Sequence, residues 1–439
     1  MSSPSDVTDE SADKMPQPTA YRWYALAVLF LVSVLNTIDK SLIPALAEPI
    51  RLEFDLSDSE LGLLVGLVFS VAYGIASIPI GLLIDRVNRT RLLAALLVAW
   101  SLLTLLTAKT TSFLGLALCR VGVAAAESGG NPTTLALISD YFPRHERGRA
   151  VGIFSINSSI ATILVFSVSG FIAAEYGWRA AFVLAFIPGM LLALLVLLTL
   201  KEPVRGGFDP APKQQGDDKP AGLKEIFKTI VADKTLLWVT GGAILVIMGQ
   251  AGSGSFSATF FVRVHELELG KAGLITGLVL GLGFAIGTVT GGFMADKMAK
   301  TSPGGGCRFI AFVTLMAVPF GMIGFTVPVL AVAIPCLFAF QVLGTCFYAA
   351  SLSIILNLSP LKMRGSIITY VSIALNLGGY GFGPQITGAM SDMYRLLGAA
   401  EPLRWALVST VAVMLISSSF YFIAANRLNR GASAAPETT

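Results

Sequence analysis

Four ionisable side chains interrupt two long apolar runs of this 439-residue sequence, and their types suit proton exchange and anion binding. Arg120 and Glu127 lie in one run, and Asp39 and Lys40 lie in the middle of another nearer the N-terminus. A charge placed in hydrocarbon costs at least about 2.5 kcal/mol unless it faces a partner or water. We therefore expect these four side chains to face a cavity rather than lipid.

The spacing of Arg120 and Glu127 places both on one face of a helix. Seven residues are almost two α-helical turns, about 10 Å of rise. The small residues between them, Gly122 and 124–126, allow neighbouring backbones to approach closely. The pair is either the ionisable wall of a cavity at mid-membrane or a buried salt bridge that only fixes helix packing.

Proton exchange requires a carboxyl group that can be either protonated or ionised. Burial favours the protonated form of such a group, and a nearby cation favours the ionised form. Our hypothesis is that Glu127 is the main proton-carrying group, with Asp39 coupled to it. Arg120 and Lys40 are the candidate ligands for an anionic substrate. Because adjacent helical residues point about 100° apart, Asp39 and Lys40 cannot both face one partner, and either could be the one turned toward the cavity.

Composition places the chain among polytopic helical membrane proteins. Apolar residues make up 54% and charged residues only 13%, and the mean hydropathy is +0.74. The two histidines, His145 and His265, lie in predicted loops, and the four cysteines show no metal or disulfide spacing. We therefore predict no enzyme activity, no metal, no cofactor other than a proton gradient, and no nucleic-acid partner.

The hydrophobic runs predict an all-α membrane protein of twelve transmembrane helices in two pseudo-symmetric six-helix bundles. The predicted spans are 22–46, 60–83, 91–108, 112–139, 147–173, 179–200, 235–263, 269–296, 307–326, 328–356, 364–391 and 402–425. The predicted parts are a disordered tail (1–21) without a signal peptide, an N-terminal bundle (22–200), a linker (201–234), a C-terminal bundle (235–426) and a second tail (427–439). Within the linker, Leu223 to Val231 has the spacing of an amphipathic surface helix.

The basic residues predict the orientation of these spans. With both termini inside, the inner segments hold 22 of the 31 lysines and arginines, whereas the outer loops hold seven. Basic residues favour the cytoplasmic side of a membrane. We therefore expect both termini in the cytoplasm.

The two bundles are related by an internal repeat. The series Gly62-x-x-x-Gly66, Gly81 and Asp85-Arg86 recurs 211 residues later as Gly273-x-x-x-Gly277, Gly292 and Asp296-Lys297. Pro143-x-x-x-Arg147-Gly148 returns 217 residues later as Pro360-x-x-x-Arg364-Gly365. Two parallel repeats are typical of alternating-access transporters, whose substrate site lies between the halves near the midplane.

The segment GLLIDRVNRTR, from Gly81, resembles the signature loop of the major facilitator superfamily, and GGFMADKMAK, from Gly291, is similar to its second copy. The first half resembles the spinster subfamily, the proton-linked lysolipid and sphingosine-phosphate transporters. The matching motifs are Asn36-x-x-Asp39-Lys40, Leu56-Ser57-Asp58-x-x-Leu61-Gly62, Arg120-Val-Gly, Glu127-x-x-x-x-Pro132 and Ser139-Asp140-Tyr141-Phe142-Pro143. Lys40 departs from the arginine more usual in the subfamily, which weakens a phosphate-clamping role carried over to it.

This resemblance implies roles for further residues. It places Asp39 in the cavity beside Arg120 and Glu127. It also implies that the signature loop and its copy latch the halves in the outward-open state, and positive-inside anchoring is the alternative for the arginines. The implied gate residues are Asp85, Arg86, Arg89, Asp296 and Lys297.

The second half lacks such charges, since the repeat places Gln250 opposite Asp39 and Gly344 opposite Glu127. Its polar and aromatic side chains suggest an uncharged wall suited to an amphiphile, although ordinary interhelical hydrogen bonding would also explain them. The candidate substrate-binding residues are Arg120, Lys40, Asn36, Gln250, Ser253, Tyr348 and Asn376.

Together these features favour a proton-coupled alternating-access transporter of a lysophospholipid or a similar anionic or zwitterionic single-chain amphiphile. The first alternative is a proton-coupled carrier of small organic anions such as sugar acids. A lipid receptor or a membrane enzyme is disfavoured by the paired loops and by the missing catalytic constellation. We expect a multi-pass protein of a bacterial inner membrane that functions as a monomer, with protons, substrate and the bilayer as its partners.

Overall fold

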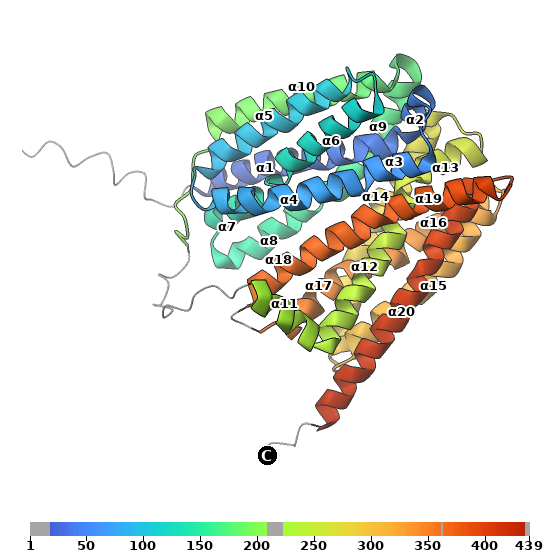
Figure 1. Ribbon diagram of the computed structural model, residues 1–439. Coiled ribbons are helices and arrows are strands. Elements are labelled where there is room, and N and C mark those ends of the chain that lie inside the picture. Colours follow the sequence, from blue (N-terminus) through green and yellow to red (C-terminus); the bar gives the residue numbers. More distant parts are fainter. Residues whose placement is uncertain (1–17, 209–222, 361–362, 435–439) are drawn as a thin grey trace, which may run out of the picture.

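Long apolar helices dominate the structure, a computed structural model that describes residues 18–208, 223–360 and 363–434. Two groups of helices lie side by side along the molecule (Figure 1). The first group contains α1 (Thr19–Ala45), α2 (Ala47–Phe54), α3 (Asp58–Val65), α4 (Leu67–Ile84), α5 (Arg89–Thr107), α6 (Phe113–Glu127), α7 (Gly130–Tyr141), α8 (Arg144–Ser155), α9 (Asn157–Tyr176) and α10 (Trp178–Thr199).

The second group follows the short helix α11 (Leu223–Ala232). It contains α12 (Lys234–Ser255), α13 (Ser257–Val264), α14 (Leu269–Ala299), α15 (Gly305–Thr326), α16 (Leu330–Thr345), α17 (Phe347–Leu358), α18 (Arg364–Leu375), the π-helical segment η2 (Asn376–Gly381), α19 (Phe382–Leu396) and α20 (Pro402–Ala434).

Eleven helical spans of the described residues are long and apolar enough to cross a membrane. Several of these spans join two of the helices above across a short break, such as Phe113–Tyr141 and Leu330–Leu358. The remaining predicted span, 364–391, is the eleventh in chain order and is interrupted by η2, so neither α18 nor α19 reaches that length alone. A π-turn adds one residue to the helix and is tolerated where neighbours fix the freed backbone groups. The prediction of a twelve-helix all-α membrane fold is confirmed.

Polar residues set where several of these helices begin. Ser57 and Glu60 form a capping box at α3. Asn88 caps α5, Ser112 caps α6, and Asp233 accepts from two backbone N–H groups at the start of α12. Each such cap satisfies N–H groups that the helix leaves unpaired, and its loss costs about 1 kcal/mol.

The breaks within the spans follow the repeat. α1 ends before Leu46 and α12 ends before Phe256, and each is continued by a short helix, α2 or α13. The fourth span is broken after Glu127 and the tenth at Cys346. The two halves therefore share interruptions as well as motifs.

The buried apolar residues form separate clusters in the two groups. One cluster of the first group surrounds Trp100 between α1, α5, α7 and α10, and another surrounds Leu46 and Phe182. The large cluster of the second group includes Phe260, Phe325 and Tyr421. The clusters also reach across the seam, since the second-half cluster includes Ala47 and Leu61 and the first-half cluster around Leu46 includes Ala258.

The two ends of the molecule differ in how the halves meet. The terminal end carries the start of α1, the end of α20 and the connections α4–α5, α7–α8 and α14–α15. The distal end carries α2, α13 and the connection α19–α20 (Figure 1). The halves meet mainly through α9 with α14, α3 with α19, α4 with η2, and α2 with α13.

The repeated glycines make these contacts between the halves. A Cβ on Gly62 would press against the carbonyl oxygen of Pro384, and one on Gly66 against that of Gly381. Their repeat partners Gly273 and Gly277 meet the backbone of α9 in the same way. Because glycine at such positions lets backbones approach closely, the Gly-x-x-x-Gly repeat serves as the packing seam between the halves.

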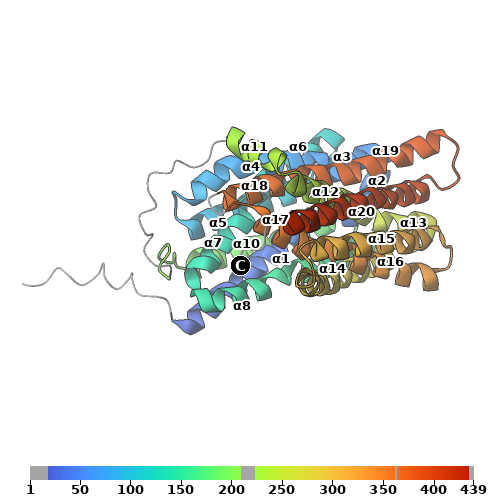
Figure 2. The same ribbon diagram turned by 90° about the horizontal axis from the view of Figure 1, so that it is seen from below.

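The linker is described only in part. The predicted amphipathic helix is present as α11, which lies beside α18 in both views (Figures 1 and 2). The predicted tail to residue 17 and the proline-containing stretch 209–222 lie outside the described residues. α20 continues to Ala434, beyond the predicted start of the C-terminal tail at residue 427.

Candidate functional site

Two broken helices bring the charged cluster together, by which we mean Asp39, Lys40, Arg120 and Glu127. α1 supplies the first two and α6 the last two. Asp39 and Arg120 are each 4% exposed, Glu127 is fully buried and Lys40 is half-buried. The structure therefore assembles the four residues that sequence reasoning singled out.

The cluster is not held together by salt bridges. Among the described residues, no cation lies within 4.0 Å of the carboxylates of Asp39 or Glu127, and their four oxygens have no hydrogen-bond partner of good geometry. The Thr104 hydroxyl and the Glu127 carboxylate both act electrostatically on the Asp39 carboxylate. The alternative was a salt bridge between Arg120 and Glu127 that only fixes packing. The described residues contain no ion pair between these two side chains.

Arg120 and Lys40 are instead held by a backbone oxygen and by aromatic rings. Arg120 Nη2 donates to the carbonyl oxygen of Lys40 at 2.9 Å. The Arg120 guanidinium carbon lies 4.2 Å from the ring centre of Phe69, and Lys40 Nζ lies 4.8 Å from that of Tyr73. Sequence reasoning missed both aromatic residues, because Phe69 and Tyr73 look like ordinary apolar positions of a membrane helix.

Asn36 lies one turn before Asp39 and is also buried. A Cβ on Gly130 would lie 3.3 Å from its Nδ2, so the side chain packs against the start of α7, where the fourth span is broken. The Nδ2 group has no hydrogen-bond partner in the described residues. Asn36 therefore offers a free donor near the charged cluster.

In the second half, the side chain of Gln250 fills the space over Gly344. These are the two residues that the repeat sets opposite Asp39 and Glu127. Both polar atoms of the Gln250 amide are buried without a partner, as is Oδ1 of Asn376. The second half thus repeats the positions of the carboxylates in a neutral form.

Two other predicted residues of this half are placed differently. The hydroxyl of Ser253 donates to the carbonyl oxygen of Gly249 in its own helix at 2.7 Å. Tyr348 is 41% exposed and packs edge-on against Phe284 and Phe347. Ser253 is therefore occupied by its helix, whereas the Tyr348 ring remains accessible.

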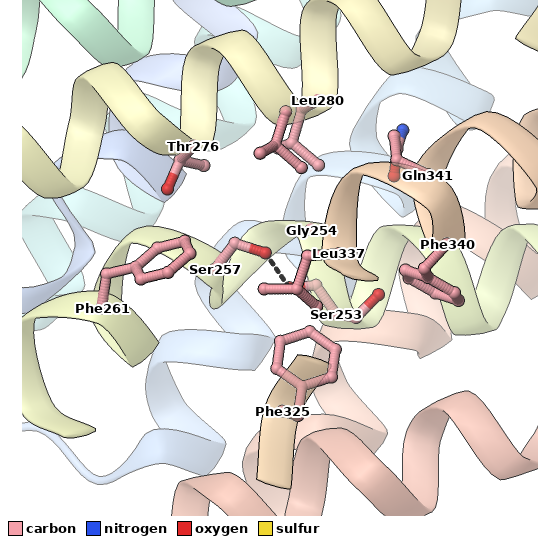
Figure 3. A pocket seen from close by; sticks show the side chains of 11 residues that line it. Ser253, Gly254, Ser257, Phe261, Thr276, Leu280, Phe325, Leu337, Phe340 and Gln341 are labelled. Atoms are coloured by element: carbon pink, nitrogen blue, oxygen red, sulfur yellow. Dashed lines mark hydrogen bonds between the residues drawn. The ribbon is translucent and has the colours of Figure 1, made fainter. Parts of the chain in front are cut away.

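Ser253 also lines a small cavity that lies entirely within the second half (Figure 3). Its wall includes Phe325, Leu337 and Phe340, and the Ser257 hydroxyl donates within it to the Ser253 carbonyl. The buried hydroxyl of Thr276 on this wall has no partner. A single water is the guest that such a polar niche accommodates.

At the terminal end, the predicted gate residues make no ion pair between the halves among the described residues. Arg89 pairs with Asp140 of its own half, and Asp85 lies 3.7 Å from Arg89 with 77% of its side chain exposed. Arg86, Asp296 and Lys297 are exposed. Their gating role stays a prediction. The resemblance implies that these residues hold the halves together in the outward-open state, and in this conformation they do not join the halves.

The distal end holds a set of charges that the sequence analysis did not assign, which we call the distal clasp. It consists of Glu48 and Asp58 of the first half and Arg263, Asp392 and Arg395 of the second. The fully buried Asp58 carboxylate accepts from Arg263 Nη1 and Arg395 Nη2 at about 2.9 Å.

Further bonds complete the clasp. Arg263 Nε donates to Glu48 at 2.6 Å, and the Asp392 carboxylate accepts from the backbone N–H groups of Asp58 and Ser59. Asp392 thereby caps α3 from the other half of the molecule. The only sequence signal was that Asp58 belongs to a matched motif.

Comparison with known proteins agrees with this architecture. The family model described as Major Facilitator Superfamily matches residues 29–384. The chain belongs to the major facilitator superfamily. Within this superfamily it is similar to a bacterial homologue of the human lysosomal transporter spinster, solved in an inward-facing, unoccupied conformation. That structure is 28% identical, with a TM-score of 0.85, over 96% of this chain and 100% of its own.

Two curated members of the superfamily extend the comparison. An MFS-type efflux pump of Mycolicibacterium smegmatis is 29% identical over 98% of both chains. A hexuronate transporter of Bacillus subtilis is 24% identical over 92% of this chain and 94% of its own. The superfamily and the spinster likeness predicted from sequence are confirmed, and the protein is a membrane transporter.

Proposed function

We propose that the protein is a proton-coupled secondary transporter that moves a lysophospholipid or a similar single-chain amphiphile by alternating access. One observation carries the proposal: within the described part of the chain, two buried carboxylates without hydrogen-bond partners lie in one cluster with two cations that form no ion pair with them. An isolated buried charge is costly, and a proton removes that cost from a carboxylate. The cations remain available to an anion.

The proton and the substrate are coupled through the net charge of the cluster. With all four groups ionised, the cluster is neutral. An arriving anionic headgroup at Arg120 adds a negative charge, which protonation of Glu127 or Asp39 offsets. We assign Glu127 as the main proton carrier and Asp39 as the group coupled to it, since these carboxylates influence each other directly.

An amphiphile fits the contrast between the two halves. Gln250 and Asn376 present unpaired neutral groups, and Tyr348 and Tyr380 expose aromatic rings. The resemblance of the sequence motifs to the spinster subfamily implies the same substrate class. Arg120 would hold the anionic part of the headgroup, with Lys40 and Asn36 beside it.

A sugar-acid carrier is the alternative function. A relative named for hexuronate spans nearly the whole chain, and the buried Nε of Arg120 has no partner. A carboxylate could occupy that donor. We further propose that both termini face the cytoplasm of a bacterial inner membrane and that one chain suffices for transport.

Reconstituted proteoliposomes test the proposal. The panel comprises lysophosphatidylglycerol, lysophosphatidylcholine, glucuronate and galactonate, each with and without an imposed pH gradient. We expect gradient-dependent movement of a lysolipid. Movement of the sugar acids alone would favour the alternative, and transport indifferent to the pH gradient would contradict proton coupling.

Substitution of the carboxylates tests the assignment of the proton carrier. Glu127→Gln should abolish the pH dependence of transport, and Asp39→Asn should weaken it. Glu175→Gln, which changes an exposed carboxylate near the end of α9, is the matched control for loss of one negative charge. A Glu127→Gln protein whose transport keeps the pH dependence of wild type would exclude Glu127.

A further inference from the structure

An aromatic pair near the start of α4 contacts both cations of the charged cluster. Phe69 and Tyr73 are one turn apart, and their rings stack with centres 5.8 Å apart. Arg120 lies over Phe69, and Lys40 lies over Tyr73 with Phe69 at 5.9 Å. The pair thus joins α4 to both α1 and α6 at the cluster.

An aromatic face holds a cation without using its hydrogen-bond donors. The guanidinium of arginine is planar, so a ring against its face leaves the N–H groups at its edge free. Of these groups, Arg120 Nη2 is used by the Lys40 carbonyl, whereas Nε is buried without a partner. A salt bridge to Glu127 would have taken the same donors.

We propose that Phe69 and Tyr73 are positioning residues that hold Arg120 and Lys40 on their ring faces, apart from Asp39 and Glu127, so that the substrate anion takes the free donors. This inference rests on the proposed function and deepens it by naming what sets anion affinity. It requires the rings to act through the cations rather than by touching the substrate.

The neighbouring residue ties the pair to the seam between the halves. Ser70 is buried, and a Cβ on Gly381 of η2 would lie 3.2 Å from the Cβ of Ser70. α4 begins at Leu67, directly after the break at Gly66. A movement of the second half against α4 therefore acts on the segment that holds the cations.

Transport kinetics test the proposal, measured with the compound of the proteoliposome panel that the wild-type protein moves. Phe69→Leu removes the ring but keeps an apolar side chain, and Phe69→Tyr keeps the ring. We expect Phe69→Leu to raise KM roughly threefold to thirtyfold, the factor that a desolvated cation–π contact corresponds to. The maximal rate of Phe69→Leu should differ from that of wild type by less than about twofold. The KM of Phe69→Tyr should stay near the wild-type value.

Phe154→Leu is the matched control, because Phe154 is similarly buried but packs in an apolar cluster, and no cation of the described residues lies over its ring. An unchanged KM in Phe69→Leu, or equal shifts in the two leucine variants, would overturn the proposal. Tyr73→Leu should act in the same direction as Phe69→Leu but more weakly, since Lys40 is half-buried.

A measurement without substrate separates this inference from the proposed function. If wild type moves no compound of the panel, the proposed function fails, yet thermal unfolding still reports the contact. Phe69→Leu should lower Tm in the wild-type background and by a clearly smaller amount in Arg120→Gln. Equal losses of Tm in both backgrounds would overturn the positioning role.

Discussion

The two ends of the molecule use their charges differently. At the distal end, Asp58 of the first half binds Arg263 and Arg395 of the second. At the terminal end, Arg89 pairs with Asp140 and Arg22 with Glu146, and each of these pairs lies within the first half. The distal charges, by contrast, fasten the halves to each other in this conformation.

A transporter that worked by alternating access, as proposed above, would need such a difference between a closed end and an open end. A gate must be stable when shut and must release as a unit. The clasp meets the first need by burying Asp58 with both arginines, and it is concentrated on short helices, α2, α3 and α13, that flank the long ones. At the terminal end, Asp85 and Asp296 are exposed, and their predicted role as gate residues concerns the opposite state.

The largest effect is expected from Asp58→Asn. Breaking a buried ion pair from one side costs about 3–5 kcal/mol, which corresponds to more than a hundredfold in the ratio of closed to open distal ends. Spin labels replacing the exposed Leu52 and Leu396, one in each half, report the separation in a background without native cysteines. We expect a longer distance population in Asp58→Asn.

The same labels in Asp85→Asn provide the control for the clasp, and the distal distance should stay as in wild type. A single short distance in both variants would show that the clasp does not hold the distal end. The charge reversal of Asp58→Arg with Arg263→Asp should restore part of the short population.

Two glycines of one helical span give the next effect. A Cβ on Gly66 would press against the Gly381 carbonyl, whereas one on Gly74 meets no atom within 4 Å. Gly66→Ala should slow transport about tenfold or more, because the seam cannot close. Gly74→Ala should change the rate less than about twofold and should raise Tm slightly, since alanine favours a helix by about 0.5–1 kcal/mol. Similar transport rates in the two variants would show that close packing at Gly66 is not needed for transport.

The smallest effect concerns a distal ion pair that does not join the halves. Arg179 Nη1 and Trp178 Nε1 donate to the Glu53 carboxylate at 2.5 and 2.6 Å, and these bonds lower the pKa of Glu53. A lowered pKa stabilises the fold above the ordinary glutamate pKa, and the contribution disappears as the pH falls through the lowered value.

Glu53→Gln should therefore cost less than about 1 kcal/mol of stability at pH 7, because the pair is partly exposed, and still less at pH 3. Thermal unfolding at the two pH values measures the difference. The spin-label distance across the distal end should not respond. A response as large as that of Asp58→Asn would erase the distinction between pairs within and between halves.

The spans and the charged cluster were predictable for a common reason. Long apolar runs are unambiguous, and a charge inside one is rare enough to attract attention, so Arg120 and Glu127 stood out. The offset of the repeat also set Gln250 opposite Asp39 and Gly344 opposite Glu127, and the structure places Gln250 against Gly344. These predictions needed only local pattern and one periodicity.

The partners of these residues could not be predicted. Asp58 meets Arg263 and Arg395 across 205 and 337 residues of sequence, and nothing in spacing selects those arginines among 31 basic residues. Phe69 and Tyr73 were missed because an aromatic residue every turn is ordinary in a membrane helix. Contacts across a seam depend on the rotation of whole helices, which single-sequence patterns do not contain.

The π-helical segment has a consequence for insertions and deletions. Each residue turns an α-helix by about 100°, so the extra residue in Asn376–Gly381 rotates the face that α19 presents. The hydroxyl of Ser391, the Asp392 carboxylate and the Arg395 guanidinium reach Asp58 in that rotated register. Deleting a single glycine from Gly378-Gly379 would swing all three away at once. The length of this segment, more than its composition, keeps the distal side chains aimed at their partner.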